Sequence, residues 1–228
     1  MKTKYIFIIT FSFFVILLGI GLLNKNTFKD FNKEDSPLEK FEIGILPENL
    51  LNSQLKMMDK KLDKSKIIIA AKCESRIHFS FSNIMQDVKI ERVFKGQTLN
   101  IGDTITIVNG GDLISLNNNL SATDDMHVIN LNFVNELIPG NTYLIFINDV
   151  VHALQNKTLY VVNRDFFLSP IFCYQPIENI PLESVDKNYN AIPYKDAKEN
   201  EFFLMSEEGI EKLYAYKQKL FKKYPYQS

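Results

Sequence analysis

The chain opens with an unbroken uncharged run, Tyr5–Leu23, which follows two lysines, Lys2 and Lys4. A bilayer core about 30 Å thick is crossed by roughly 20 apolar helical residues. A cleavable signal peptide has a shorter apolar core of about 7–15 residues and then an Ala-x-Ala pattern, which this chain lacks. Residues 1–23 are therefore predicted to form an uncleaved signal anchor, a transmembrane helix. The alternative is a cleaved signal peptide with a long core.

The charges around this run predict an orientation. Lys2 and Lys4 precede it, where the positive-inside rule places the cytoplasm. The chain is thus expected to cross the cell membrane once with its C-terminal domain extracytoplasmic, or to be secreted if the segment is cleaved. A polar, mixed-charge stretch predicts a linker at residues 24–46, and a domain is expected at residues 47–228.

Two segments of the domain have the period of a helix. After Pro47, four apolar residues fall on one helical stripe: Leu51, Leu55, Met58 and Leu62. Near the C-terminus, Ser206 is a good N-cap before an amphipathic helix. Its apolar face is formed by Ile210, Leu213, Tyr214, Leu220, Phe221 and Tyr224. Its lysines, Lys217, Lys219, Lys222 and Lys223, predict either a solvated basic edge on a packed helix or a helix that lies on an anionic membrane.

Between these helices the pattern changes to that of strands separated by turn residues. Segment 143–147 is apolar on both faces, which predicts a central strand with Phe146 buried. Pro139-Gly140-Asn141 predicts a turn before it. The strand-like segments are 67–73, 77–82, 88–91, 104–108, 129–133, 143–147, 159–162 and 166–168. Strands without helical periods between them predict a mainly β domain with flanking helices (α+β), built on an antiparallel barrel or sandwich.

Three of these segments carry a resemblance. They are VKIERVFKG at Val88–Gly96, IGDTITIV at Ile101–Val108 and LIPGNTYLIFI at Leu137–Ile147. Together they resemble bacterial exported domains of unknown function, which are similar to the small OB-like barrels of tissue-inhibitor-of-metalloproteinase and netrin modules. The resemblance covers about residues 66–174 and implies a small antiparallel OB-like barrel. It implies no catalytic residues.

Composition and motifs exclude several functions. The formal net charge is −1 with 23% charged residues, and no basic face is evident, so no nucleic-acid partner is expected. His78, His127 and His152 lack the spacing of a metal site. No nucleophile elbow or P-loop is present. No catalytic, cofactor-binding or metal-binding residue is therefore predicted, and a non-enzyme is favoured.

Two other features remain. The chain has two cysteines, Cys73 and Cys173, in an expected oxidising compartment. This predicts either a disulfide or two small buried apolar side chains.

The polar insertion 112–125 predicts a partner-binding loop or a tolerated insertion. Its candidate residues are Asp112, Asn117, Asn118, Asn119, Asp124 and Asp125.

These patterns predict a membrane-anchored extracytoplasmic binding domain with a protein partner of the cell envelope. The first alternative is a cell-envelope hydrolase with a dispersed active site. A third prediction is an accessory subunit that binds through its C-terminal helix.

Overall fold

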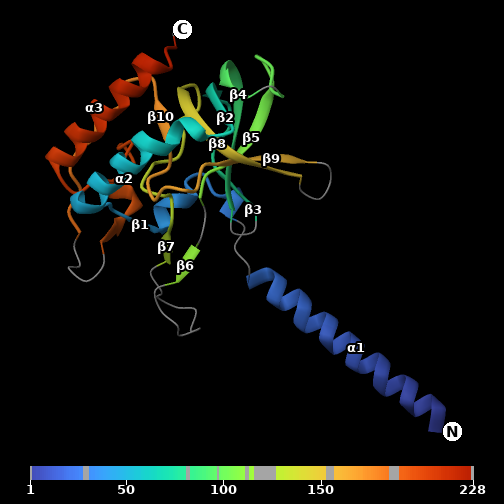
Figure 1. Ribbon diagram of the computed structural model, residues 1–228. Coiled ribbons are helices and arrows are strands. Elements are labelled where there is room, and N and C mark those ends of the chain that lie inside the picture. Colours follow the sequence, from blue (N-terminus) through green and yellow to red (C-terminus); the bar gives the residue numbers. More distant parts are fainter. Residues whose placement is uncertain are drawn as a thin grey trace. The chain divides into compact units, whose positions relative to one another are not determined.

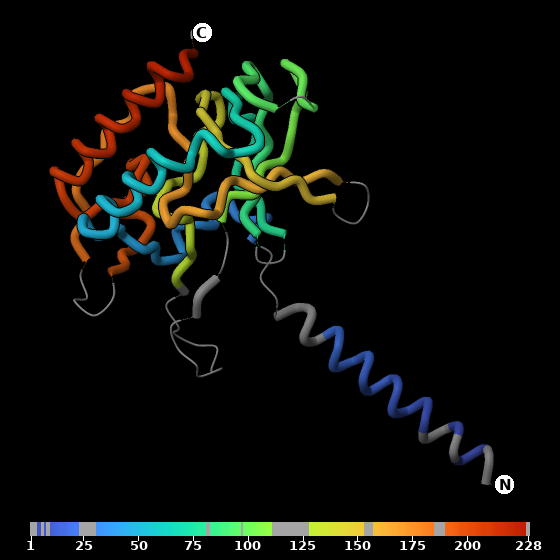
Figure 2. The backbone as a smooth tube through the Cα atoms, viewed as in Figure 1, coloured from blue at the N-terminus to red at the C-terminus, as the bar shows by residue number. Residues whose placement is uncertain are grey.

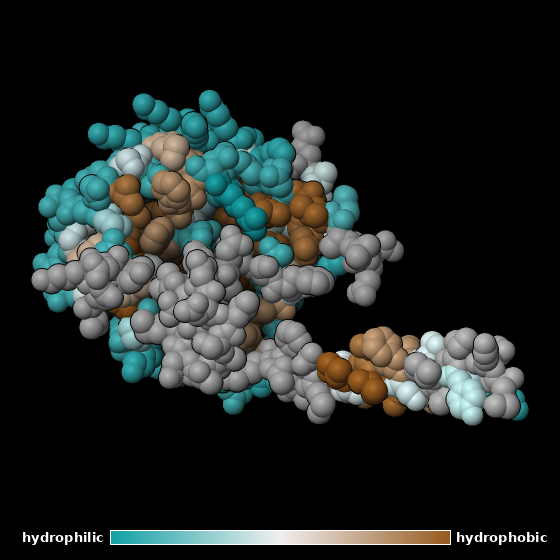
Figure 3. Space-filling view, turned by 90° about the horizontal axis from the view of Figure 1, so that it is seen from below, coloured by the Kyte–Doolittle hydropathy of each residue, from teal (hydrophilic) through white to brown (hydrophobic). Residues whose placement is uncertain are grey.

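The computed structural model describes residues 2–27, 31–80, 83–96, 98–110, 113–115, 127–152, 157–184 and 190–226. The chain divides into two compact units, Met1–Asp35 and Ser36–Ser228. The first unit contains helix α1 (Lys2–Thr27) and a short 3-10 helix, η1 (Phe31–Lys33). Figure 3 shows apolar and weakly polar side chains exposed along α1. Phe7 and Leu22 are among the exposed side chains of this helix.

The segment expected to be a transmembrane helix is thus helical. In the part of the chain that the structure describes, however, no helix is both long enough and apolar enough to cross a membrane.

The second unit is built on a closed five-stranded barrel, β2–β4–β5–β9–β8 and back to β2 (Figure 1). Its strands are β2 (Ile67–Cys73), β4 (Asn83–Lys95), β5 (Thr104–Val108), β8 (Thr142–His152) and β9 (Thr158–Val162). The predicted barrel is confirmed, but it is not wholly antiparallel, because β5 and β9 pair in parallel. Two short strands extend the sheet: β3 (His78–Ser80) pairs with β4, and β10 (Ile171–Cys173) pairs with β8.

The central strand of this sheet is β8, as its apolar sequence predicts. Residues 143–145 pair with β2 along one edge and with β10 along the other, and residues 147–152 pair with β9. Every residue from Thr142 to Ile147 is buried, and Phe146 is 0% exposed. The predicted burial of Phe146 is confirmed.

A second, four-stranded sheet was not predicted. Its order is β11–β1–β7–β6, from β1 (Glu42–Gly44), β6 (Leu113–Ser115), β7 (His127–Ile129) and β11 (Ala191–Pro193). It changes the interpretation of segment 24–46, because Leu38, Phe41 and Ile43 of the expected linker are buried in the domain. The strand expected at 129–133 instead ends at Ile129, and residues 166–168 are not a strand.

Two helices cover one side of the domain. They are α2 (Glu48–Lys61), followed by the 3-10 helix η3 (Leu62–Lys64), and α3 (Glu207–Lys223). Figures 1 and 2 show them side by side. Both helices bury the apolar face that the sequence predicts, including Leu51 and Met58 on α2 and Leu213 and Leu220 on α3. Ser206 is the N-cap of α3, and its hydroxyl accepts a hydrogen bond from the Gly209 backbone N–H at 3.1 Å. Two further 3-10 helices are η2 (Pro37–Lys40) and η5 (Tyr194–Asp196).

Candidate functional site

A wide groove of about 770 Å³ lies on the outer wall of the barrel. We call it the barrel groove. Strands β2 and β4 form its floor, and two turns form its walls. Its lining residues are Lys72, Cys73, Glu74, Lys89, Ile90, Glu91, Ile101, Gly102, Pro139 and Gly140.

Both walls are fixed to the floor by backbone hydrogen bonds. The Gly102 N–H donates to the Ile90 carbonyl at 2.8 Å, and the Gly140 N–H donates to the Cys73 carbonyl at 2.9 Å. Both glycines have a left-handed backbone, with φ of +93° and +94°, which favours glycine at these turns. The groove is therefore preformed, and its rim includes Ile101, which is 70% exposed.

The floor of the barrel groove carries two lysines opposite each other. Strand register places Lys72 directly across from Lys89, with Thr142 beyond Lys72 and Thr104 beyond Lys89. Directly opposed residues have Cβ atoms about 4.5–5.5 Å apart, and like charges in such a pair are destabilising. In the described part of the chain, neither ammonium lies within 4.0 Å of a carboxylate. We call Lys72 and Lys89 the lysine pair.

The carboxylates on the same outer face take hydrogen bonds from threonines. The Thr104 hydroxyl donates to Glu74 at 3.0 Å, and the Thr142 hydroxyl donates to Glu91 at 2.9 Å. The Thr106 hydroxyl likewise donates to Asp87 at 2.6 Å. Acidic side chains thus flank the lysine pair, but none of those in the described ranges forms an ion pair with it.

An enzyme would need a cleft in which groups suited to proton transfer or nucleophilic attack converge. The lining residue with a thiol is Cys73, whose side chain is buried under the floor. Burial raises the pKa of its thiol to about 12, so it stays protonated at neutral pH. Cys73 is therefore an inert side chain of the core.

The disulfide predicted between Cys73 and Cys173 is not formed, because both thiols are free and buried. The two cysteines lie on β2 and β10, which pair with opposite edges of β8. Strands two positions apart in a sheet are separated by about 9–10 Å, beyond the roughly 7 Å between Cα atoms that a disulfide can bridge. The alternative, two small buried side chains, is the one observed.

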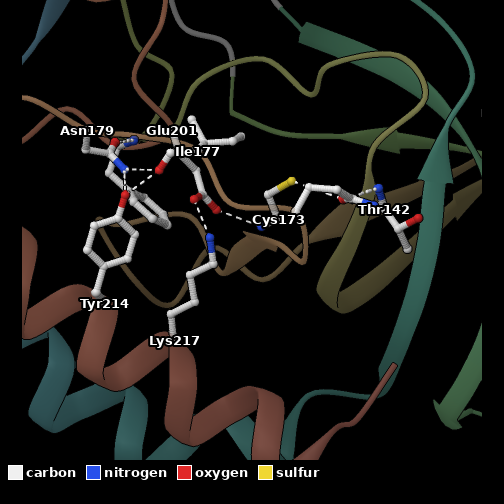
Figure 4. Close-up of polar contacts among 9 residues, drawn as sticks. Thr142, Cys173, Ile177, Asn179, Glu201, Tyr214 and Lys217 are labelled. Carbon is white, nitrogen blue, oxygen red and sulfur yellow. Dashed lines mark hydrogen bonds and ion pairs between the residues drawn. The ribbon is translucent and has the colours of Figure 1, made fainter. Parts of the chain in front are cut away.

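A second cluster of polar side chains lies inside the domain (Figure 4). The Lys217 ammonium on α3 contacts the Glu201 carboxylate at 2.5 Å, and both side chains are at most 4% exposed. The other Glu201 oxygen accepts a hydrogen bond from the Cys173 backbone N–H of β10 at 2.7 Å. This cluster connects α3 to the edge of the barrel sheet. Since it is sealed from solvent, it has a structural role.

The lysines of α3 are mostly engaged within the domain. Lys212 pairs with Glu48 of α2 at 2.8 Å, Lys219 pairs with Asp59, and Lys223 pairs with Asp63. With Lys217 buried, Lys222 is left exposed and without an ion pair among the described residues. This agrees with a packed helix and leaves little free charge for an anionic membrane.

The remaining predicted site residues are distributed as follows. The six loop residues Asp112, Asn117, Asn118, Asn119, Asp124 and Asp125 lie outside the described residues. The three histidines lie on different strands, His78 on β3, His127 on β7 and His152 at the end of β8. Within the described ranges, no group of three or more His, Cys, Asp or Glu side chains is placed to hold a metal ion.

The sequence predicted the turns of the barrel groove but not its floor. Ile101-Gly102-Asp103 and Pro139-Gly140-Asn141 are recognisable turns. Lys72 stands out as a charge in the apolar run 67–73, which is the signal that it faces outward. Its position opposite Lys89 depends on strand register, which the local pattern does not give. No protein-family model matches the chain, and no curated protein is detectably similar to it.

Proposed function

We propose that this chain is a membrane-anchored, extracytoplasmic binding protein that holds a protein partner of the cell envelope in the barrel groove. The observation that carries the proposal is the preformed groove, with an exposed isoleucine on its rim and, on its floor, a lysine pair that has no ion-pair partner in the part of the chain that the structure describes. Residues that bind partners concentrate on loops that a rigid scaffold positions. Both groove walls are turns of that kind.

The strand arrangement supports an OB-like barrel as the scaffold. Counting the barrel strands along the chain, the order around the ring is 1-2-3-5-4, closed by the pairing of the fourth strand with the first. An OB-fold is likewise a five-stranded Greek-key barrel that binds ligands on its outer surface and loops. Membership of the group similar to netrin modules stays a prediction.

The membrane anchor rests on the sequence. The uncharged run Tyr5–Leu23 follows two lysines, and its described side chains are exposed along α1. Cells should retain the protein in the membrane fraction after alkaline extraction, and protease added to intact protoplasts should digest the domain. Release by alkaline extraction, or a protected domain, would contradict the anchored orientation.

The binding role is tested by photo-crosslinking in the native membrane. A photoreactive amino acid in place of Ile101, on the groove rim, should give a discrete adduct with a partner protein. The matched control places the same amino acid at Ile180, which is 55% exposed and is not among the residues that line the groove. An adduct pattern that is the same at both positions, or no adduct at Ile101, would count against the groove as the binding site.

A further inference from the structure

We infer that the barrel groove recognises an extended peptide segment in which one acidic residue lies between apolar residues. This inference rests on the proposed function and specifies the chemistry of the partner. The acidic side chain places its carboxylate between Lys72 and Lys89, and an apolar neighbour packs against Ile101.

The lysine pair defines the charge of the ligand. Lys72 and Lys89 are directly opposed on neighbouring strands, and neither ammonium lies within 4.0 Å of a carboxylate of the described residues. A ligand carboxylate between them relieves their repulsion and forms charge-assisted hydrogen bonds, which are about twice as strong as neutral ones. Among the described residues the nearby carboxylates are not in this position, because Glu74 and Glu91 are oriented toward Thr104 and Thr142 and neither lies within 4.0 Å of the Lys72 or Lys89 ammonium.

The surrounding charges limit the ligand to one acidic group at this point. Glu74, Asp87 and Glu91 flank the lysine pair on the outer face of β2 and β4. A polyanion such as nucleic acid, or a run of acidic residues, would place further negative charges beside these carboxylates. One carboxylate between uncharged neighbours avoids this repulsion.

The size and rim of the groove favour a peptide over a small anion. A single inorganic anion fills only a small part of about 770 Å³ and leaves Ile101 in water. The opposite wall presents Pro139, whose apolar ring is exposed. A peptide that is apolar on both sides of its acidic residue covers both rims.

A random-peptide display library, selected on the full chain in detergent micelles, tests the inference. Enriched peptides should share one Asp or Glu between apolar residues. Their affinity should fall about tenfold or more for the Lys72→Gln/Lys89→Gln variant, as expected for the loss of a charge-assisted hydrogen bond. The control, Lys222→Gln, removes an exposed lysine of α3 and should leave affinity unchanged. Replacing the acidic residue of the peptide by its amide should weaken binding to the wild type but not further weaken binding to the double variant.

The outcomes separate this inference from the proposed function. If selected peptides lose affinity for Ile101→Ser but bind the double lysine variant as tightly as the wild type, the groove binds peptides and the acidic specificity is wrong. If neither variant changes the affinity of any selected peptide, the groove is not a binding site and both proposals are wrong.

Discussion

Lys217 shows how a single residue departs from the local pattern. Its place among the lysines of the last helical turns predicts a solvated cation, yet its ammonium is buried against Glu201. Three aromatic rings surround it, those of Phe202, Tyr214 and Phe221, with centroids 5.6–5.8 Å from the nitrogen. Cations are attracted to the faces of aromatic rings. The buried charge is therefore compensated by Glu201 and Phe202, which precede α3, and by Tyr214 and Phe221 on α3 itself.

Removing either partner of this pair should destabilise the domain strongly. Lys217→Met or Glu201→Gln leaves a buried polar or charged group without its partner, which typically costs about 3–5 kcal/mol. The double variant should recover most of that loss, since neither charge remains. Urea denaturation of the full chain measures the change, with Lys222→Met as the exposed control. Single variants within about 1 kcal/mol of the wild type would show that the pair contributes little.

Phe146 and Phe167 form a matched pair for testing the barrel core. Phe146 is fully buried on β8. The centroid of its ring lies 6.4 Å from the ring centroid of Phe172 and 5.6 Å from that of Tyr224. Phe146→Ala should lower the free energy of unfolding by about 3–5 kcal/mol. Phe167 is 62% exposed, so Phe167→Ala should change the free energy of unfolding by less than about 0.5 kcal/mol. Equal effects of the two substitutions would contradict the assignment of β8 as the central strand.

At the scale of elements, α2 and α3 are joined by complementary charge. The acidic partners come from α2 and η3, and the basic partners come from α3, so the two helices run side by side in the same direction. The Lys212 hydrogen bond lowers the pKa of Glu48, and the Lys223 hydrogen bond lowers the pKa of Asp63. A carboxylate whose pKa is lowered by folding stabilises the folded state above its unfolded pKa.

The contribution of these pairs should therefore disappear in acid. As the pH falls from about 5 to about 3, through the ordinary pKa range of Asp and Glu, the melting temperature of the wild type should decrease. Glu48→Gln/Asp63→Asn should have a lower melting temperature at pH 6 and a smaller decrease on acidification. Glu211→Gln on α3, whose carboxylate has no ion pair among the described contacts, should keep the wild-type pH dependence. If the melting temperature of the double variant shows the same dependence on pH as that of the wild type, the Glu48 and Asp63 ion pairs are not the cause of the loss of stability in acid.

The strength of the local pattern explains which elements the sequence predicts. Helices α2 and α3 and strands β2, β5 and β8 have long apolar periods, so the sequence alone locates them. Strands β1 and β11 have three residues each, and their pairing of Ile43 with Ile192 joins distant segments. The parallel pairing of β5 with β9 and the lysine pair likewise depend on long-range register. The barrel was therefore predictable, whereas the second sheet and the groove floor were not.

At the scale of the whole molecule, the two units should be separable. The buried apolar residues of the domain begin at Leu38, after the boundary at Asp35. Deleting residues 1–35 should therefore leave the melting temperature of the domain within about 2 °C of that of the full chain, which corresponds to at most about 1 kcal/mol for a domain of this size. A larger decrease would show that the first unit stabilises the second.

A slightly longer deletion provides the contrast. Removing residues 1–46 also removes β1 and, besides the buried Pro37, five side chains of the hydrophobic core, those of Leu38, Phe41, Ile43, Ile45 and Leu46. Each buried apolar side chain contributes about 1.5–3 kcal/mol, so their joint loss exceeds or equals the whole stability of a typical domain. The shortened protein should lack a cooperative melting transition. Retained cooperative melting would restore the original interpretation of residues 24–46 as a linker.

Closure of the barrel by the pairing of β5 with β9 also sets how long a strand edge stays unpaired while the chain is being synthesised. At synthesis rates of about 5–20 residues per second, β5 is complete several seconds before Val162, the end of its partner β9, is made. Until then one edge of β5 has no partner, and an unpaired strand edge is a template for joining other chains. Pairings between distant strands also form slowly, over milliseconds to seconds in β-rich proteins. The interval before ring closure is therefore the period in which this edge is most exposed to pairing with another chain.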